Sequence, residues 1–233
     1  MNTVTSSLEI TNALNVRSLL PTLDSRVAHK IEIGVATTKD ELDECYRIRH
    51  QVYVLDEGIP LCEGHASDNR VIDEADETGI VLYAKIGGKI IGTTRVNIGY
   101  QKWKLYRDIF SLSQLEGYFA DSVAVLSRMA VLKDYRASGR TFLELSKASY
   151  RLALEMGANV SILGCKSELI SMYEKLGFAQ YKNGVAVPGY GTLLPLILHN
   201  YDEERLTKSR SPWLPVLKAH QMGNQQEQCK PVA

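Results

Sequence analysis

Apolar and polar residues alternate in several short segments of the chain and follow a helical period in others. Alternation over 31–37 predicts a strand, and the two apolar runs that flank Gly87-Gly88 predict a β-hairpin. Further strands are predicted over 122–132 and 159–165, and a final pair within 178–200. The segments 59–79, acidic, and 100–120, rich in aromatic residues, follow neither period, so we expect a long loop in the first and predict no order for the second.

Three segments have the spacing of amphipathic helices. The first opens at the capping residues Thr38 and Asp40, and its apolar positions are Leu42, Cys45, Ile48, Val52 and Leu55. The second follows Gly139 and places apolar side chains on one side and basic ones on the other, namely Arg140, Lys147 and Arg151. The third, 168–177, is short and ends at a glycine.

The order of these elements predicts a mixed α/β fold. One strand–helix–strand crossover lies among strands joined by hairpins, which gives a mostly antiparallel sheet with flanking helices. We expect one domain over 31–200, preceded by an arm or docking helix over 1–30. A C-terminal extension covers 201–233, and we expect its last part, from Gly223, to be disordered.

Composition removes several function classes. The 27 basic and 27 acidic side chains cancel, so no overall charge points to nucleic acid or to a membrane surface. No run approaches the roughly 20 apolar residues of a membrane span, and the first residues lack the pattern of a signal peptide. The four cysteines lack the spacing of a metal site. We therefore expect a cytoplasmic protein with reduced thiols, no metal and no nucleic-acid partner.

The turn between the strand at 122–132 and the next helix carries a candidate anion site. Its sequence, KDYRASGR, ends in a glycine flanked by arginines and leads straight into the helix. Backbone N–H groups at a helix N-terminus bind phosphate groups, and glycine allows close approach of the backbone. The same glycine would also suit an ordinary strand–helix turn.

Two motifs together resemble the Gcn5-related N-acetyltransferase superfamily. Arg136-Ala-Ser-Gly139-Arg-Thr141 is similar to its Q/R-x-x-G-x-G/A turn, with Thr141 in place of the small residue. YEKLGF, beginning at Tyr173, is similar to the run that starts with the tyrosine acid of many such enzymes. The resemblance covers about 30–198. It implies the superfamily's fold and transfer of an acyl group from a thioester to an amine.

The first helix narrows the resemblance. YRIRHQVYVLDEGIP, 46–60, is similar to a stretch of long-chain N-acyl amino acid synthases, which are relatives of the acyl-homoserine lactone synthases. Asp73, Asp76, Arg95 and the Ser-Arg pair at Arg128 parallel a series that both groups share. Lactone synthases usually carry a glutamate where this chain has Val125, and a tryptophan after the first helix that is missing here. These departures favour the amino acid synthases.

The resemblance implies where the acyl donor binds. The pantetheine phosphate would lie on the turn, and the backbone around Met129 to Val131 would supply an N–H to the oxyanion. Thr141 is expected to crowd a pyrophosphate, which favours the single phosphate of a carrier protein. The donor-site residues on the turn are Arg136, Gly139, Arg140 and Thr141. The basic side of the following helix either docks an acidic carrier protein or is an ordinary solvated surface.

Aminolysis of a thioester requires a base for the amine and an acid for the departing thiolate. The resemblance makes Tyr173 the acid, although a buried tyrosine can also be plain core. The candidate bases are the carboxylates of the loop region, although a solvated or structural role suits each one better when it is taken singly: Glu57, Asp73, Glu74 and Asp76.

Three arginines lie on apolar elements, where an unpaired guanidinium is costly. They are Arg49, Arg95 and Arg128. Either they pair with Asp73 and Asp76, or one of them grips the acceptor's carboxylate in bidentate fashion. We expect both arrangements, with Arg95 or Arg128 as the clamp.

The sequence therefore predicts an N-acyltransferase that moves an acyl group, expected to be long, from acyl carrier protein or acyl-CoA to the amine of an amino acid or related molecule. No tightly bound cofactor is expected. The alternatives are an acyl-homoserine lactone synthase, a conventional acetyl-CoA-dependent acetyltransferase, and a catalytically inactive module that binds acyl thioesters.

Overall fold

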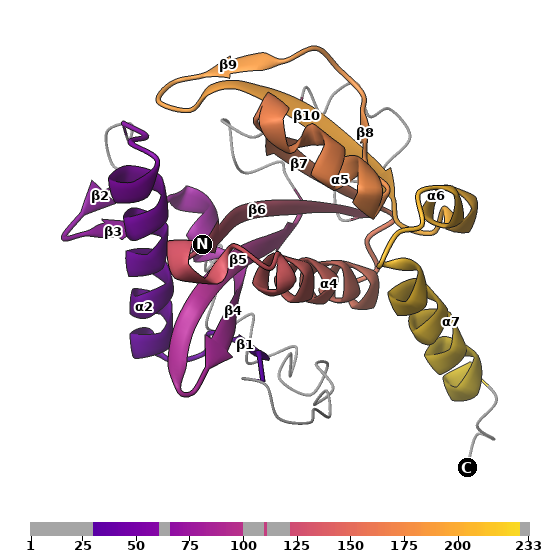
Figure 1. Cartoon of the computed structure of the whole chain (residues 1–233). Helices are drawn as coiled ribbons and strands as arrows, with labels where there is room; N and C mark the ends of the chain where they lie inside the picture. The colour runs from indigo at the N-terminus through magenta and orange to yellow at the C-terminus, as the bar shows by residue number, and fades with distance from the viewer. Residues whose placement is uncertain (1–29, 61–65, 100–109, 111–121, 229–233) are drawn as a thin grey trace, which may run out of the picture.

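The computed structural model of the chain describes residues 30–60, 66–99, 110 and 122–228 (Figure 1). The predicted N-terminal arm and most of the aromatic-rich segment 100–120 lie outside these residues. Within them, one eight-stranded sheet organises the molecule.

The sheet has the order β1-β4-β5-β6-β7-β10-β8, with β9 paired to β10. Its first half consists of β1 (Glu32–Val35), β4 (Ile80–Ile86), β5 (Lys89–Ile98) and β6 (Val123–Val131). The second half consists of β7 (Val160–Cys165), β8 (Ala179–Gln180), β9 (Val185–Val187) and β10 (Gly191–His199). Only the β6–β7 pair is parallel, so the predicted mixed, mostly antiparallel sheet is confirmed.

The two halves meet over a very short seam. Strands β6 and β7 are in register only from Val123 opposite Val160 to Val125 opposite Ile162. Beyond that point β6 continues along β5, and β7 pairs with β10 through Cys165 opposite Leu194. The carboxyl-terminal parts of β6 and β7 therefore separate, which opens a gap in the middle of the sheet.

Helices α2 (Lys39–His50) and α4 (Arg140–Glu155) cover opposite faces of the first half. Leu42, Cys45 and Ile48 of α2 pack with Val81 and Tyr83 of β4. The alternate β4 residues, among them Leu82, pack with Leu145 and Leu152 of α4. This alternation follows from the two-residue period of a strand. A capping box between Thr38 and Glu41 starts α2, as the predicted cap requires.

The end of the first helix departs from the predicted spacing. After His50 the chain continues as a π-helix, η2 (Gln51–Asp56), in which each turn holds extra residues. Val52 remains buried, but Leu55 is turned outward and is exposed. The expectation that Leu55 shares the apolar face is therefore wrong.

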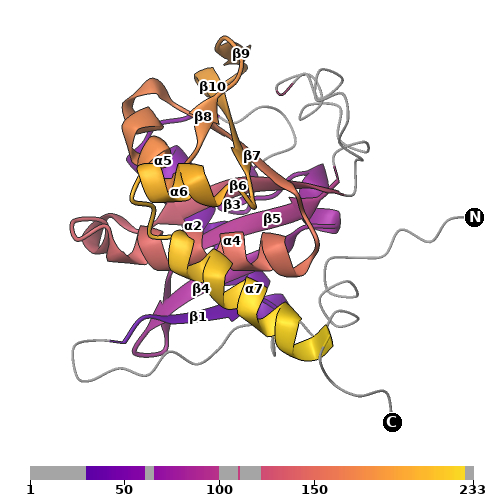
Figure 2. The same ribbon diagram turned by 90° about the vertical axis from the view of Figure 1, so that its right-hand side faces the viewer.

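The C-terminal segment packs on the second half of the sheet. Helices α6 (Glu203–Lys208) and α7 (Leu214–Gln228) bring Leu206, Trp213 and Leu217 against Tyr150 of α4 and Phe178 (Figure 2). Helix α7 carries the chain to Gln228, past Gly223, where we expected order to end. The chain is thus helical as far as Gln228, and 229–233, the rest of the predicted disordered part, lie outside the described residues.

Short elements fill the loops that the sequence left unassigned. The acidic segment holds the hairpin β2 (Ala66–Ser67) and β3 (Arg70–Val71) and a 3-10 turn, η3 (Glu74–Glu77). Two further 3-10 turns precede helices: η6 (Lys133–Tyr135) before α4, and η7 (Ser167–Leu169) before α5 (Ile170–Leu176). In the described part of the chain, no helix is long and apolar enough to cross a bilayer.

Candidate active site

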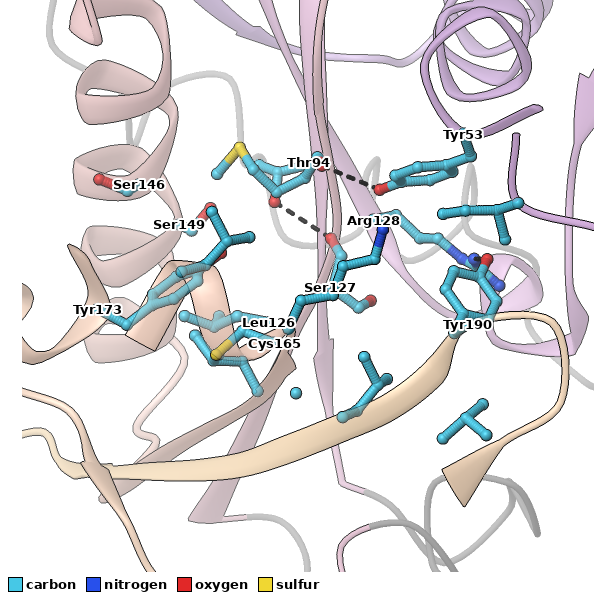
Figure 3. A pocket seen from close by; sticks show the side chains of 18 of the residues that line it. Tyr53, Thr94, Leu126, Ser127, Arg128, Ser146, Ser149, Cys165, Tyr173 and Tyr190 are labelled. Carbon is cyan, nitrogen blue, oxygen red and sulfur yellow. Dashed lines mark hydrogen bonds between the residues drawn. The ribbon is translucent and has the colours of Figure 1, made fainter. Parts of the chain in front are cut away.

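A cavity of about 220 Å³ lies at the gap between β6 and β7 (Figure 3). Residues of β6 from Leu126 to Met129 form one wall, and Leu163 to Lys166, at the end of β7, form another. Helices α4 and α5 close one side, and the η2 segment and the β9–β10 turn close the other. These outer walls include Tyr53, Glu57, Ser146, Ser149, Tyr173 and Tyr190.

A bulge in β6 shapes the first wall. Thr93 pairs with Ala130 and Arg95 with Ser127, so Arg128 and Met129 together face Thr94. Arg128 adopts a φ of 56°, which is uncommon for a residue other than glycine. Two cavity residues hold the bulged backbone: the Tyr53 hydroxyl donates to the Met129 carbonyl at 2.9 Å, and Thr94 Oγ1 donates to the Ser127 carbonyl at 3.2 Å. The bulge thus directs Arg128 and Met129 toward the cavity.

Behind the bulge lies a cluster of buried ion pairs. Arg95 contacts Asp73 at 2.6 Å and Asp76 at 2.9 Å, and Arg49 contacts Asp76 at 2.8 Å. The two aspartates also form a capping box for η3, in which Asp73 accepts the Ala75 N–H and Asp76 accepts the Asp73 N–H. The side chains of Arg49 and Arg95 are 0% exposed. The cluster therefore fixes the acidic loop to α2 and β5.

The arginines control the ionisation of both aspartates. Burial by itself would raise the pKa of Asp73, but Arg95 and Arg128 outweigh it and hold that pKa well below its ordinary value. The pKa of Asp76 is lowered in the same way, because Arg49 and Arg95 outweigh its burial. Both carboxylates are therefore strongly bound anions, which makes them poor acceptors of a proton from an amine.

Arg128 links the buried cluster to the cavity. Its guanidinium pairs with Asp73 and donates to the Tyr190 hydroxyl. Its carbon Cζ also lies 5.7 Å from the centre of the Tyr190 ring, and the Tyr53 ring meets Tyr190 edge-on at 6.4 Å. Of the three predicted acceptor-binding arginines, Arg128 lines the cavity, whereas Arg49 and Arg95 do not.

Tyr173 stands on the opposite side of β6, toward α4 (Figure 3). Its ring packs edge-on against Phe142 and Phe178, with 5.9 Å between centroids in each pair. Burial, with a smaller contribution from the Cys165 thiol, raises the pKa of Tyr173, so the phenol stays protonated. Among the residues that the structure describes, none forms a hydrogen bond with the Tyr173 hydroxyl. The phenol is therefore free to act on a ligand.

Glu57 and Lys166 approach each other from opposite walls of the cavity. Glu57 follows η2, Lys166 follows β7, and their charged groups are 3.3 Å apart. Each side chain is about one third exposed, at 35% and 38%. Of the four candidate bases, Glu57 lines the cavity; Asp73 and Asp76 lie in the buried cluster, and Glu74 is exposed on η3.

The glycine turn lies at the start of α4. Gly139 is the N-cap and adopts a φ of 64°, a left-handed conformation that suits glycine. Arg136 is already engaged, donating to the Val131 carbonyl at 2.6 Å and pairing with Asp56 at 3.1 Å. Arg140 is exposed, and its N–H donates to Ser138 Oγ at 3.3 Å. Arg140, unlike Arg136, forms no ion pair with the described residues and faces solvent at the start of α4.

Thr141 does not occupy the turn. Its side chain is buried, and its methyl group lies 3.3 Å from the position that a Cβ on Gly92 would take. The threonine therefore packs against β5, and the expected crowding of a pyrophosphate is not what its position produces.

Sequence reasoning assigned no role to several cavity residues. Tyr190 lies between Gly189 and Gly191, whose φ values are 80° and 77°. An aromatic residue between two turn-forming glycines was the available signal. Lys166, Ser146 and Ser149 gave none, because isolated lysines and serines are ordinary surface or helix residues.

A sequence model of the family described as N-acyl amino acid synthase FeeM matches residues 44–201, more than half of the chain. The chain belongs to that family. It is therefore an acyltransferase of the N-acyl amino acid synthase type, as the first-helix and tyrosine motifs predicted. No curated protein is similar enough in sequence to count as a relative.

Solved structures share the fold. The FeeM synthase from uncultured soil microbes is 14% identical, with a TM-score of 0.64 over 78% of this chain and 98% of its own. The CoA-dependent acyl-homoserine lactone synthase BjaI, solved with SAM and isopentyl-CoA, is 16% identical, with a TM-score of 0.60 over 84% and 100%. A putative N-acetyltransferase from Lactobacillus plantarum is 17% identical, with a TM-score of 0.53 over 72% and 96%. At these identities the likeness establishes the fold, which is that of the predicted superfamily.

Proposed function

We propose that this acyltransferase moves a long acyl chain from the phosphopantetheine thioester of acyl carrier protein to the amine of an amino acid, in the cytoplasm. The observation that carries the proposal is the cavity at the gap between β6 and β7. It brings two groups to opposite sides of one strand: the protonated Tyr173, whose hydroxyl has no hydrogen-bond partner among the described residues, and the Arg128 cation, which other side chains hold in place. A thioester and an amino acid carboxylate need those two groups.

In this proposal the acyl donor lies along β6. The phosphate lies at the N-terminus of α4, where the first helical turn after Gly139 offers N–H groups and Arg140 adds a charge. The pantetheine arm then follows the separated strands inward, past Val131, to the bulge. There the backbone N–H of Met129 would stabilise the oxyanion of the thioester carbonyl. Arg136, paired with Asp56, supports the turn rather than the phosphate in this arrangement.

In this proposal the amino acid acceptor lies on the other side of β6. Arg128 faces its carboxylate, and the Tyr190 hydroxyl and Asp73 keep the guanidinium oriented. Glu57 is the base for its amine, because it is the candidate carboxylate on the cavity wall that lies outside the buried cluster. Arg49, Arg95, Asp73 and Asp76 then serve as the scaffold that holds Arg128.

The reaction uses these groups in order. The amine nitrogen loses a proton to Glu57, directly or through a water, and attacks the thioester carbon. The tetrahedral oxyanion collapses, the C–S bond breaks, and an amide forms. The departing thiolate takes a proton from Tyr173, whose raised pKa keeps it protonated until that moment, and the second proton that the nitrogen loses as the amide forms restores the phenol through solvent. The products are the N-acyl amino acid and the free thiol.

The choice of donor rests on the surface beside the turn. Arg140, Lys147 and Arg151 form a basic strip on α4 that suits an acidic carrier protein, although Lys147 pairs with Glu144 at 3.2 Å. BjaI, with the same fold, was solved with isopentyl-CoA, so CoA esters are the natural comparison.

Product mass and thiol release decide between these donors and acceptors. Palmitoyl-carrier protein, palmitoyl-CoA and acetyl-CoA are each offered with a pool of free amino acids and, separately, with S-adenosylmethionine. We expect acyl–amino acid masses mainly from the carrier protein. Lactone product from S-adenosylmethionine would make the protein an autoinducer synthase, and turnover with acetyl-CoA alone a conventional acetyltransferase. Donor binding without any product would indicate an inactive binding module.

A further inference from the structure

Gly164, near the end of β7, has no conformational reason to be glycine. It is a strand residue without a positive φ, unlike the glycines of the turns. A Cβ added to it would meet Leu193 Cδ1 at 3.5 Å and Phe110 Cε1 at 3.6 Å, which are ordinary contact distances. Glycine inside a strand also weakens the strand relative to alanine. Neither backbone geometry nor a steric clash therefore explains this residue.

Its position in the cavity supplies an explanation. Strand alternation places Leu163 and Cys165 in the core beneath α4, and Ile162 and Gly164 on the opposite face of the sheet. On that face the cavity wall includes the apolar side chains of Phe110, Val187 and Leu193, and the Tyr190 hydroxyl there is already bonded to Arg128. An absent side chain at Gly164 leaves room beside this wall, at the gap in the sheet.

The other face of the cavity is less suited to a hydrocarbon. Its wall includes the hydroxyls of Ser146, Ser149 and Tyr173. Trp213 is there too, with its indole N–H 3.4 Å from Ser146 Oγ. An alkyl chain gains more by leaving water for apolar side chains than for hydroxyl groups from which it would displace water. The chain therefore belongs on the Phe110 face.

We propose that the acyl tail runs through the gap onto the Phe110 face, and that the missing side chain at Gly164 sets the chain length that the enzyme accepts. This inference rests on the proposed acyl transfer. A methyl group at Gly164 would narrow the passage slightly, and a valine would close it against Leu193. Gly164 then determines the length of acyl chain that fits and takes no part in the chemistry.

The test compares kcat/KM for palmitoyl- and octanoyl-carrier protein in wild type, Gly164→Ala and Gly164→Val. We expect Gly164→Val to lower the palmitoyl-to-octanoyl ratio about tenfold or more, as overpacking of a filled apolar site does. Gly164→Ala should lower the ratio less while raising the melting temperature by about 2 °C, since it strengthens the strand. Adding Leu193→Ala to Gly164→Val should restore the palmitoyl reaction.

Gly223→Ala is the matched control. Gly223 lies in α7 with nothing within 4 Å of an added Cβ, so this substitution should also raise the melting temperature without moving the ratio. If the Gly164 variants lose kcat/KM equally for both donors, or leave the palmitoyl-to-octanoyl ratio unchanged, Gly164 does not set the chain length. The proposed function would still stand. Wild-type enzyme that acylates no amine from either donor would overturn the proposed function and this inference with it.

Discussion

The two sides of β6 use polar groups in opposite ways. Behind the strand, Arg49, Arg95, Asp73 and Asp76 bond to one another and are closed off from solvent. On the cavity side toward α4, the Tyr173 hydroxyl points toward the space where a ligand fits and has no hydrogen-bond partner in the described residues. The first set would lose its partners if it reacted, whereas the Tyr173 hydroxyl would gain a partner from a bound ligand. Whether a polar side chain already has a bonding partner therefore indicates more about its chemical role than the number of polar side chains nearby.

This contrast separates stability from rate. Substitutions in the buried cluster should unfold the protein before they change the reaction, and substitutions on the cavity wall should slow the reaction while the fold persists. Arg128 lies between the two, since it is 8% exposed and contacts both Asp73 and Tyr190. Its variants are expected to affect both properties.

Asp73→Asn should have the largest effect on the fold. Its side chain is 4% exposed and serves two arginines, so its loss leaves buried charge uncompensated and should lower the free energy of unfolding by about 3–5 kcal/mol. Urea unfolding measures this change. Asp68→Asn, whose side chain is 80% exposed, is the control and should change it by less than about 0.5 kcal/mol. Equal effects of the two substitutions would contradict the scaffold role.

The pH dependence sharpens the same comparison. Because the folded-state pKa of Asp73 is lowered, its contribution is present above the unfolded-state pKa of about 4 and is lost as pH falls through the folded value. The difference between wild type and Asp73→Asn should therefore be constant near neutral pH and shrink below about pH 4. Unfolding curves collected across that range check it, and a difference that grows in acid would be inconsistent with the ion pairs.

Tyr173→Phe should have the largest effect on the reaction. Removing the acid should slow thiol release by about 10²-fold, while the two aromatic contacts of the ring are kept and the melting temperature stays within a few degrees. Single-turnover thiol release measures the chemical step. Tyr201→Phe, on the surface, is the control. An unchanged single-turnover rate would remove Tyr173 from the mechanism.

Tyr190→Phe should act more weakly and on binding. The Arg128 guanidinium loses one acceptor, and a hydrogen bond to a charged group is typically worth about 1.5–3 kcal/mol, so KM for the amino acid should rise about tenfold with kcat nearly retained. Initial rates over a range of amino acid concentrations separate the two constants. A fall in kcat alone would place Tyr190 in the chemical step instead.

Lys166→Met should have the smallest effect. Its pair with Glu57 is partly exposed, and such pairs contribute about 1 kcal/mol or less, so the free energy of unfolding should change by no more than that. The same urea experiment applies. A loss comparable to that of Asp73→Asn would show that the two sides of the site are not as different as their burial suggests.

The sequence was sufficient for the elements with strong local signals. The hairpin at Gly87-Gly88, the crossover through α4 and the cap at Thr38 all follow from short stretches whose residues determine their own conformation. The π-helix after His50 could not be predicted, because the apolar residues of the sequence keep the α-helical spacing through Leu55. The helix beyond Gly223 was missed because α7 is held by Trp213 and Leu217, residues earlier in the same segment.

The site was predictable as a set of residues but not as an arrangement. Asp73 and Asp76 were foreseen as ion-pair partners or as bases, and the three arginines as their partners or as ligands of the acceptor's carboxylate. Only the position of each side chain relative to the cavity distinguishes these roles. That position depends on which face of β5 and β6 each side chain occupies, and the bulge at Arg128 shifts the alternation there. A bulge depends on the paired strand as well as on its own residues, so a single sequence does not reveal it.

Because the seam between β6 and β7 is short, a bound substrate could complete the sheet between these two strands. Only three registered pairs join the two halves of the sheet, and beyond them no other described strand lies between β6 and β7. An extended pantetheine arm carries amide groups that can bridge the two strands there as a temporary strand. A donor that binds there only in the folded state would also stabilise that state by mass action. The free energy of unfolding should therefore be larger with donor bound than without it. In each turnover, donor binding would then stabilise the contact between the two halves of the sheet, and product release would weaken it again.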